Sequence, residues 1–495
     1  MHIITPQDHT RRAFLRRSAQ LAFTGAALPT ALNLAAIGEA AAFNATGYKA
    51  LVCVFLNGGN DNWNTVVPYD NASYDFYSTI RGGGAGRAAG GVALGQADLT
   101  NTLLTPTTAL AGGRQFAFHP SMTGLAGLFN SGQLAVQMNV GPLVVPVTKA
   151  QYAGQNRAVY PLPPKLFSHN DQQSVWQSSS PEGSTVGWGG NIGDLALSSN
   201  GGGSLFTCIS ITGNAVFLSG DQALAYQVSP QGAVKINCVS NNVFGSEAIK
   251  NTMRDLLQQA RSDVLENEYN RVTQRSIAAE SSVNGGIGAT ATAATANTGE
   301  FAPFAGILGN NNLAGQLKMV ARLIAARTSL STKRQVFFVS LGGFDLHDNL
   351  TAGHVTNMTR VSQAMTAFYQ TTANLGVASD VTAFTASDFG RTLTSNGDGS
   401  DHGWGGEHIV VGGAVKGKAF YGKPAPVSVG NGSGAEDQFH VGQGRLLPTT
   451  SVDQYAATLA RWFGVEQTEL AGILPSLGNF GLPKAVDYPI DLGFL

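Results

Sequence analysis

The chain has 495 residues, of which only 12% are charged, and a formal net charge of −1 at pH 7. This balance excludes a global electrostatic field that would draw the protein to nucleic acid or to an acidic membrane surface. A chain of this length can hold two to four domains or one large α/β domain with insertions, so core size is not limiting.

The first segment has the pattern of an export signal. Two adjacent arginines in residues 10–16 (TRRAFLR) precede a weakly apolar, alanine-rich run over 21–37, and small residues at 40–42 offer a cleavage site. This pattern resembles a twin-arginine signal rather than a basic amphipathic helix. We therefore expect residues 1–42 to be a signal peptide, the twin-arginine export machinery to be a partner, and the mature chain to be periplasmic or secreted. No later apolar run is long enough to span a bilayer.

Three apolar runs, expected to be strands, each end in an acidic, glycine-rich loop. They cover residues 50–57, 334–341 and 382–387. Helical periodicity over 120–130, 313–330 and 354–375 alternates with strands, which favours a parallel sheet. Sites form beyond the carboxyl ends of parallel strands, so we predict that the three loops converge.

The residues of these loops are those that bind divalent cations. The pool of candidate ligands comprises Asp61, Asp345, His347, Asp348, Asp388, Asp401, His402 and His408. Carboxylate oxygens and imidazole nitrogens suit Zn²⁺, Mn²⁺, Mg²⁺ or Ca²⁺, and no thiolate cluster favours a softer metal. The pool suffices for one ion or for two, which would clamp the oxygens of a phosphoryl or sulfuryl displacement. The alternative is that these are ordinary turn residues.

Two further segments carry candidate catalytic groups. Ser168 stands near the start of a predicted helix that runs through Trp176, where its hydroxyl could cap the helix, act as a nucleophile or bind a metal. His169 beside it could be a ligand or a base. Arg391, expected at a helix start after Asp388, could hold an oxyanion or pair with an acid such as Asp398.

The remaining stretches are predicted insertions. Residues 82–113 are rich in Gly and Ala and are expected to form a surface excursion, and short β-like runs in 188–244 suggest a secondary sheet or cap. Residues 245–310 are expected to be a charged helical arm that ends in a low-complexity linker at 285–299. Cys208 and Cys238 could pair in an exported protein, whereas Cys53 lies in a buried strand.

Several motifs together carry a family resemblance. They are the twin-arginine start, GGNDNWNTVVPYD, FHPSMTGLAGLF, FSHNDQQSVW, GGFDLHDN, SDFGRT and DHGWGGEHIVVGGAVKG. The set resembles the bacterial exported proteins known as domain of unknown function 1501, a family similar to the alkaline phosphatase and sulfatase superfamily. The resemblance implies a doubly wound α/β fold with a mostly parallel, alkaline-phosphatase-like sheet over residues 43–495, and two metals.

The same resemblance implies roles for individual residues. Asp61 matches the first-strand metal ligand, and Ser168 lies where a hydroxyl nucleophile would stand. Asp345 and His347 resemble the ligands of one metal, Asp388 a ligand of the other, and His402 a late histidine ligand. Two positions depart from the pattern. Phe389 stands where the superfamily often has a histidine, and Glu407 precedes His408 where the family often has two histidines.

These features predict an exported metallohydrolase-like protein that acts on a phosphate or sulfate ester or a related anionic substrate, small or polymeric. The alternative is a secreted binding or assembly protein without catalysis, which keeps the fold and one structural metal and uses its insertions as interaction surfaces.

Overall fold

The three predicted apolar strands lie side by side at the centre of one sheet. β1 (Lys49–Leu56) pairs in parallel with β7 (Arg334–Leu341) and with β8 (Val381–Ser387). In this register Val52 stands opposite Phe337 on one side and Ala383 on the other. Because the three strands run the same way, their acidic loops leave from one edge of the sheet, as the sequence predicts.

The full sheet is large, mixed and mostly parallel. Only β11 runs antiparallel to both of its neighbours, β4 and β8. The order across the sheet is β12 (Ala419–Tyr421), β4 (Leu134–Gly141), β11 (Gly406–Gly412), β8, β1, β7, β5 (Cys208–Ser210) and β6 (Tyr226–Gln227), and β13 (Thr450–Ser451) also pairs with β4. The expected α/β class with a mostly parallel sheet is therefore confirmed.

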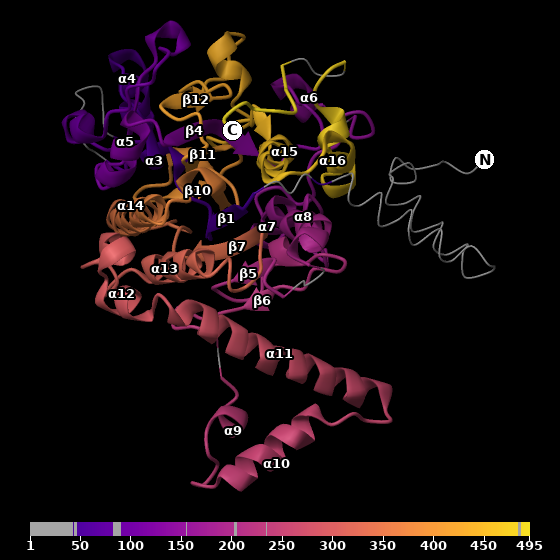
Figure 1. Cartoon of the computed structure of the whole chain (residues 1–495). Helices are drawn as coiled ribbons and strands as arrows, with labels where there is room; N and C mark the ends of the chain where they lie inside the picture. The colour runs from indigo at the N-terminus through magenta and orange to yellow at the C-terminus, as the bar shows by residue number, and fades with distance from the viewer. Residues whose placement is uncertain are drawn as a thin grey trace, which may run out of the picture.

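Helices cover both faces of the sheet (Figure 1). Alternate residues of β1 divide between two apolar clusters, since Val52 and Val54 belong to one and Cys53 and Phe55 to the other. The first cluster includes α5 (Thr123–Asn130), α13 (Asn312–Ala325) and α14 (Leu350–Asn374); the second includes α7 (His169–Ser178), α8 (Trp188–Ala196), α15 (Val452–Phe463) and α16 (Gln467–Ile473). Burial on both faces explains why the central strands are continuously apolar.

The structure is a computed structural model, and it describes residues 43, 47–82, 91–154, 156–201, 205–233, 235–483 and 487–495. The predicted signal peptide lies outside this range. Among the described residues no helix has the length and apolar character needed to cross a membrane. The remaining helices and strands are α3 (Asn62–Thr65), β2 (Val66–Pro68), α4 (Asn71–Ile80), β3 (Phe116–Phe118), α6 (Lys149–Ala153), α9 (Asn237–Ser240), α10 (Glu247–Gln258), α11 (Val264–Gly288), α12 (Ala291–Ala296), β9 (Arg391–Ser395) and β10 (Ser400–His402). Short 3₁₀ segments cover Gln96–Thr102, Ala111–Gly113, Leu197–Asn200, Val216–Leu218, Gly299–Phe304, Ala378–Asp380, Ala435–Gln438 and Leu477–Asn479.

The predictions for the internal structure of the insertions are partly wrong. The expected secondary sheet in 188–244 does not form, because β5 and β6 extend the main sheet beside β7. The expected surface excursion over 82–113 is mostly exposed at its described positions, although Leu99 within it is fully buried. The low-complexity stretch at 285–299 continues α11 and forms α12, since its alanines favour a helix.

The cysteines do not pair. Cys53 and Cys208 are buried free thiols, and Cys238 is a free, partly buried thiol on α9. Cys208 points at Gly193 of α8, where there is room only for a hydrogen at Cα. A disulfide between Cys208 and Cys238 is therefore absent: Cys208 belongs to strand β5 of the sheet, and Cys238 belongs to α9.

Beneath the edge that carries the acidic loops, β11 places a buried carboxyl group. Glu407 is 7% exposed, and Asn62 Nδ2 donates to its Oε2 at 2.9 Å. Burial raises the pKa of Glu407 to about 7, and the hydrogen bond from Asn62 only partly opposes this shift. The folded protein therefore holds a proton on Glu407 at pH values where the unfolded chain has released it.

Replacing Glu407 by Gln should remove a pH dependence of stability. The folded-state pKa lies above the reference value of 4.5, so the contribution of Glu407 is fully present below that pH and is lost as pH rises through about 7. From pH 4.5 to 8 the free energy of unfolding of the wild type should fall relative to that of Glu407→Gln by up to about 3 kcal/mol. Urea denaturation across this range measures it, with the exposed Glu182→Gln as control. If the free energy of unfolding changed with pH in the same way for all three proteins, the raised pKa of Glu407 would be contradicted.

Candidate metal centre

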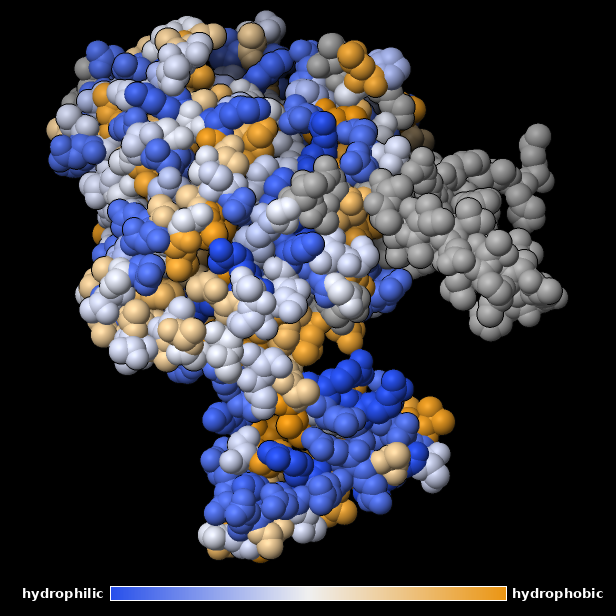
Figure 2. All heavy atoms as spheres, in the orientation of Figure 1, coloured by the Kyte–Doolittle hydropathy of each residue, from blue (hydrophilic) through white to orange (hydrophobic). Residues whose placement is uncertain are grey.

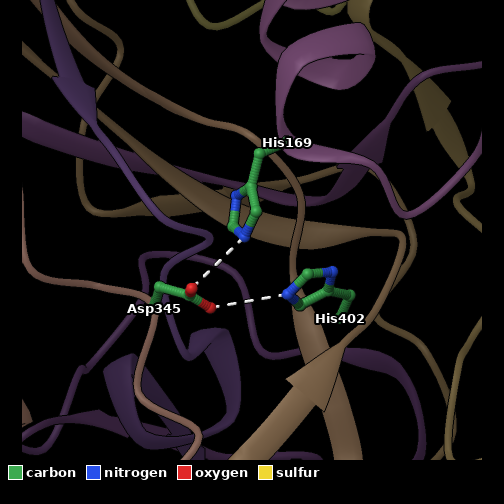
Figure 3. A group of neighbouring side chains, drawn as sticks. All are labelled: His169, Asp345 and His402. Atoms are coloured by element: carbon green, nitrogen blue, oxygen red, sulfur yellow. Dashed lines mark ion pairs between the residues drawn. The ribbon is translucent and has the colours of Figure 1, made fainter.

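Four segments that are far apart in the sequence meet at the carboxyl edge of the sheet. Asp345 follows β7, Asp388 follows β8, His169 is the first residue of α7, and His402 ends β10. Figure 3 shows His169 and His402 directed at the two oxygens of the Asp345 carboxylate. The predicted convergence of the loops after β7 and β8 is therefore observed, and the segment with His169 joins it.

The distances within this group suit a shared cation. His169 Nε2 lies 3.4 Å from Asp345 Oδ2, and His402 Nε2 lies 3.4 Å from Asp345 Oδ1. One ligand atom from each of the three residues lies within 4.8 Å of the others. Ligand atoms around a tetrahedral ion with bonds of about 2.0–2.1 Å are about 3.3 Å apart, so the spacing requires little rearrangement.

His347 lies beside this group of three. Its Nε2 is 3.0 Å from Asp345 Oδ1 and 2.9 Å from His402 Nε2. The side chain is 39% exposed, against 28% for His169 and 23% for His402, so it stands at the open side of the cluster. We call His169, Asp345, His347 and His402 the Asp345 cluster.

The second nitrogen of each imidazole is held by an oxygen atom. His169 Nδ1 lies 2.7 Å from Asp388 Oδ2, His402 Nδ1 lies 2.7 Å from Phe167 O, and His347 Nδ1 lies 3.1 Å from Asp401 Oδ1. Carboxylates and carbonyls only accept, so each Nδ1 carries the proton. The Nε2 atoms, on the opposite side of the rings, are directed toward Asp345, and His347 Nε2 also lies 2.9 Å from His402 Nε2. This arrangement of histidines anchored by oxygen acceptors is the one that metal-binding histidines adopt.

The environment sets the charges of these groups. The hydrogen bond to Asp388 raises the pKa of His169, although partial burial opposes the shift, and burial lowers the pKa of His402. Burial is the largest single influence and raises the pKa of Asp345, but the hydrogen bond and charge of Arg391 and the neighbouring His169 and His347 together outweigh it, so the net pKa of Asp345 is lowered. The carboxylate that faces the three imidazoles is therefore kept negative.

Backbone conformation and close contacts explain why Gly58 and Gly59, in the loop after β1, are glycines. Gly58 has φ +114°, its N–H donates to Asp388 Oδ1 at 3.1 Å, and a Cβ there would collide with the backbone of Asp345. A Cβ at Gly59 would collide with the ring of Phe389. That ring contacts both His169 and His402, with centroids 4.9 and 4.6 Å apart. Phe389 thus forms an apolar floor under two ligands rather than supplying one.

Phe167 also has an unusual conformation. It adopts φ +74°, in the left-handed region that residues other than glycine rarely occupy. This conformation sits one residue before the N-cap position of α7, and the Phe167 carbonyl receives His402 Nδ1. The ring of Phe167 meanwhile lies 3.9 Å from the Arg445 guanidinium. Strained residues concentrate at functional sites, and this one anchors a ligand.

Arg391 begins strand β9, not the helix expected from the sequence. Its Nη1 donates to Asp345 Oδ1 at 2.9 Å, so the acid that it pairs with is Asp345 and not Asp398. The side chain is fully buried, and its Nε and Nη2 have no hydrogen-bond partner among the described residues. Two buried donors beside the Asp345 cluster are therefore free to bind an anion.

Asp61 lies near the cluster but is engaged elsewhere. Its Oδ1 accepts from the backbone N–H groups of Trp63 and Asn64 at the start of α3, and its Oδ2 forms a buried ion pair with Arg81. Arg81 also donates to Thr392 O at 3.2 Å. The structure therefore places Asp61 in a structural ion pair and does not bring it into the cluster.

His408 and Ser168 also lie outside the cluster. His408 is buried against Trp176 with ring centroids 4.6 Å apart, and burial lowers its pKa to about 3. Ser168 occupies the N-cap position of α7, but its side chain makes no cap bond, so the capping interpretation is wrong. Its Oγ instead donates to Oδ2 of the buried Asp171 at 2.9 Å. Asp348 is exposed beside the cluster.

Some supporting residues were not identified from the sequence. The Phe167 carbonyl, Arg81 and Gln173 were missed, and Gln173 Nε2 donates to Asp388 Oδ2 at 2.8 Å. A backbone carbonyl leaves no signal in a sequence. Gln173 stands one helical turn after His169, so the i, i+4 spacing on one helix face could have pointed to it.

The fold and the cluster define an α/β protein that gathers imidazole and carboxylate groups at the carboxyl edge of a mostly parallel sheet. The chain belongs to the family described as "Protein of unknown function (DUF1501)", whose sequence model matches residues 48–473. This match confirms the resemblance to that family and covers every residue of the Asp345 cluster. No curated protein matches the chain.

Replacing Asp61 by Asn should affect stability rather than metal binding. The substitution leaves the Arg81 guanidinium buried without a counter-charge, which costs about 3–5 kcal/mol in comparable cases. Chemical denaturation measures the loss, and elemental analysis of the folded variant should show an unchanged metal content. The double variant Asp61→Asn/Arg81→Met removes both charges and should recover part of the stability. Loss of metal at unchanged stability would instead make Asp61 a ligand.

Proposed function

We propose that the Asp345 cluster binds a divalent metal ion and that the protein is a metal-dependent hydrolase. The observation that carries the proposal is the convergence of three imidazole nitrogens on one carboxylate, with every opposite nitrogen held by an oxygen. His169 Nε2 is buried and has no hydrogen-bond partner. With each Nδ1 hydrogen directed at an oxygen, the facing Nε2 atoms and the carboxylate need a proton or a cation between them, and a bound divalent ion would supply that positive charge.

The donor set favours Zn²⁺ or Mn²⁺ over Mg²⁺ or Ca²⁺. Three nitrogen ligands and one carboxylate suit the transition ions, whereas Mg²⁺ and Ca²⁺ select oxygen ligands. The cluster supports one ion. The second ion that the superfamily resemblance implies would need Asp61 and Asp388, and these side chains are occupied by Arg81 and by His169 with Gln173.

The site has the parts needed to hydrolyse a phosphate or sulfate ester. A metal ion bound there would act as a Lewis acid toward an ester oxygen. Asp388 orients His169, and Arg391 neutralises Asp345 and offers Nε and Nη2 to an anionic oxygen. Ser168 and Asp171 are hydrogen-bonded as a nucleophile and its base would be, one residue from His169. Asp345 is 46% exposed, so the cluster is open to a substrate.

The proposal also includes the fold type, the export route and the class of substrate. An alkaline-phosphatase-like arrangement agrees with a cluster that lies at the carboxyl edge of the parallel strands β1, β7 and β8, and export by the twin-arginine pathway agrees with a cofactor loaded before transport. The substrate would be an anionic small molecule or polymer. The alternative function, a secreted binding protein with one structural metal, is favoured by Phe389, which stacks on two ligands where the superfamily often places a further histidine.

Replacing His169 by Ala should release the metal. The variant loses a ligand and leaves the buried Asp388 without its imidazole partner, so metal content after dialysis should fall at least tenfold. Inductively coupled plasma mass spectrometry of the purified protein measures it. The control is His408→Asn, which removes a buried histidine outside the cluster and should retain the metal. Equal metal content in both variants, with both folded by circular dichroism, would contradict the proposed centre.

Replacing Ser168 by Ala should separate an enzyme with a serine nucleophile from one that activates water. Loss of an activated nucleophile should lower kcat at least about a hundredfold on 4-nitrophenyl phosphate or sulfate, with metal content unchanged. Ser179→Ala is a matched control, because Ser179 Oγ donates to Asp453 Oδ1 at 2.8 Å at the other end of the same helix. Unchanged turnover in Ser168→Ala would assign the attack to water. Bound metal without turnover in the wild type would favour the binding protein.

A further inference from the structure

A helical arm projects from the body of the molecule. Residues 237–278 form α9, α10 and the outer half of α11, and Figure 1 shows them extending away from the sheet and its covering helices. Asn270 Nδ2 donates to Gln259 O at 2.6 Å and joins α10 to α11 near the tip. We call this segment the arm.

The arm exposes apolar side chains that the body would bury. Of the 13 large hydrophobic residues exposed within the described chain, eight lie between residues 236 and 272. They are Ile236, Phe244, Ile249, Leu256, Val264, Leu265, Tyr269 and Val272. Figure 2 shows orange, hydrophobic patches on an otherwise largely hydrophilic projection. Monomeric proteins rarely leave such a concentration uncovered.

The exposed residues of α11 continue a stripe that is buried closer to the body. Ala279, Val283 and Ile287 are buried, with Val283 and Ile287 in the core cluster that includes α13. Toward the tip the same helix face carries Val272, Tyr269 and Leu265, which are 47%, 67% and 82% exposed. The spacing of three and four residues is that of a coiled-coil seam. The outer part of the seam therefore lacks the cover that its inner part has.

The residues of this seam are complementary to those of a second α11 helix that runs in the opposite direction. When two α11 helices run in opposite directions about a two-fold axis between Asn270 and Arg271, Tyr269 of one faces Val272 of the other, and Val264 faces Ile277. The same register brings Glu268 of one copy alongside Arg275 of the other. Within residues 263–278 the acidic side chains precede the axis and the basic ones follow it. Glu268 already pairs with Arg271 and Arg275 of its own helix, and an antiparallel second copy would place further charges of opposite sign beside them.

We propose that the arm is a dimerisation element, in which the α10–α11 pairs of two copies form an antiparallel four-helix contact. α10 adds a second exposed stripe through Ile249 and Leu256. A standard interface buries roughly 800 Å² per partner, and both α10 and the outer part of α11, which spans roughly 20 Å, would contribute to it. A two-fold axis makes the contact self-complementary and closes the assembly at two copies.

The charge of the arm argues against a membrane as the occupant of this surface. Residues 246–283 contain five basic and six acidic side chains. Helices that lie on anionic membranes carry a predominantly basic polar face. A second copy, which has the same mixed charges in reverse order, is the better match.

Sedimentation velocity of the purified full-length protein over 0.1–50 μM (roughly the range in which a standard interface dissociates) tests dimerisation. The wild type should sediment as a dimer at the upper concentrations, and Tyr269→Lys should raise the dissociation constant at least about thirtyfold, as loss of a central aromatic does. The control is Phe76→Lys, a 63% exposed residue on α4 outside the arm. A monomeric wild type, or binding of the wild type to anionic phospholipid vesicles that Tyr269→Lys abolishes, would overturn the proposal.

Cysteine cross-linking tests the antiparallel register. In a Cys238→Ser background, Tyr269→Cys and Val272→Cys variants should form a disulfide-linked dimer under mild oxidation when mixed and little when kept separate. Cross-linking of either variant alone in preference to the mixture would overturn the antiparallel register. Metal content should be unchanged in all these variants, so failure of this proposal and failure of the metal proposal are distinguishable.

Discussion

The convergence of three imidazoles on the Asp345 carboxylate is the constraint on which the edge of the sheet depends. The ligand atoms lie about 3 Å apart, and each ring is held from behind by Asp388, the Phe167 carbonyl or Asp401. Holding lone pairs together is unfavourable unless a cation or a proton lies between them. The supporting hydrogen bonds and the strained backbone of Phe167 therefore have a common explanation in one charged centre.

The centre can be this well ordered because it stands on rigid elements. β1, β7 and β8 are buried on both faces, so the ends of these strands cannot shift relative to one another without disturbing two apolar clusters. The loops are then tightened by the absence of side chains at Gly58 and Gly59, which lets the first loop contact Asp345 and Phe389. Arg391 links the two parts, since it is buried in the protein and bonded to the most exposed ligand.

The arm and the body differ in how their apolar residues are covered. The body buries most of its apolar residues in its own core, whereas most of the exposed large apolar residues of the described chain lie on or next to the arm, where we propose that a second copy covers them. A site on a rigid sheet and a projecting pair of helices serve different purposes, and changes in one need not disturb the other. This separation is why the metal centre and the dimer contact are independent proposals.

The sequence by itself determined the family, the α/β class, the three central strands and two of the loops that form the site. Apolar runs and helical periodicity report local structure, and parallel strands bring their ends together whatever lies between them. Only the tertiary structure decided that Asp61 pairs with Arg81, that His408 packs on Trp176, and that His169 faces Asp345. Aspartate and histidine look the same in a sequence as ligands, caps or core residues. Their roles depend on which distant side chains lie next to them in the folded protein, and packing determines those neighbours.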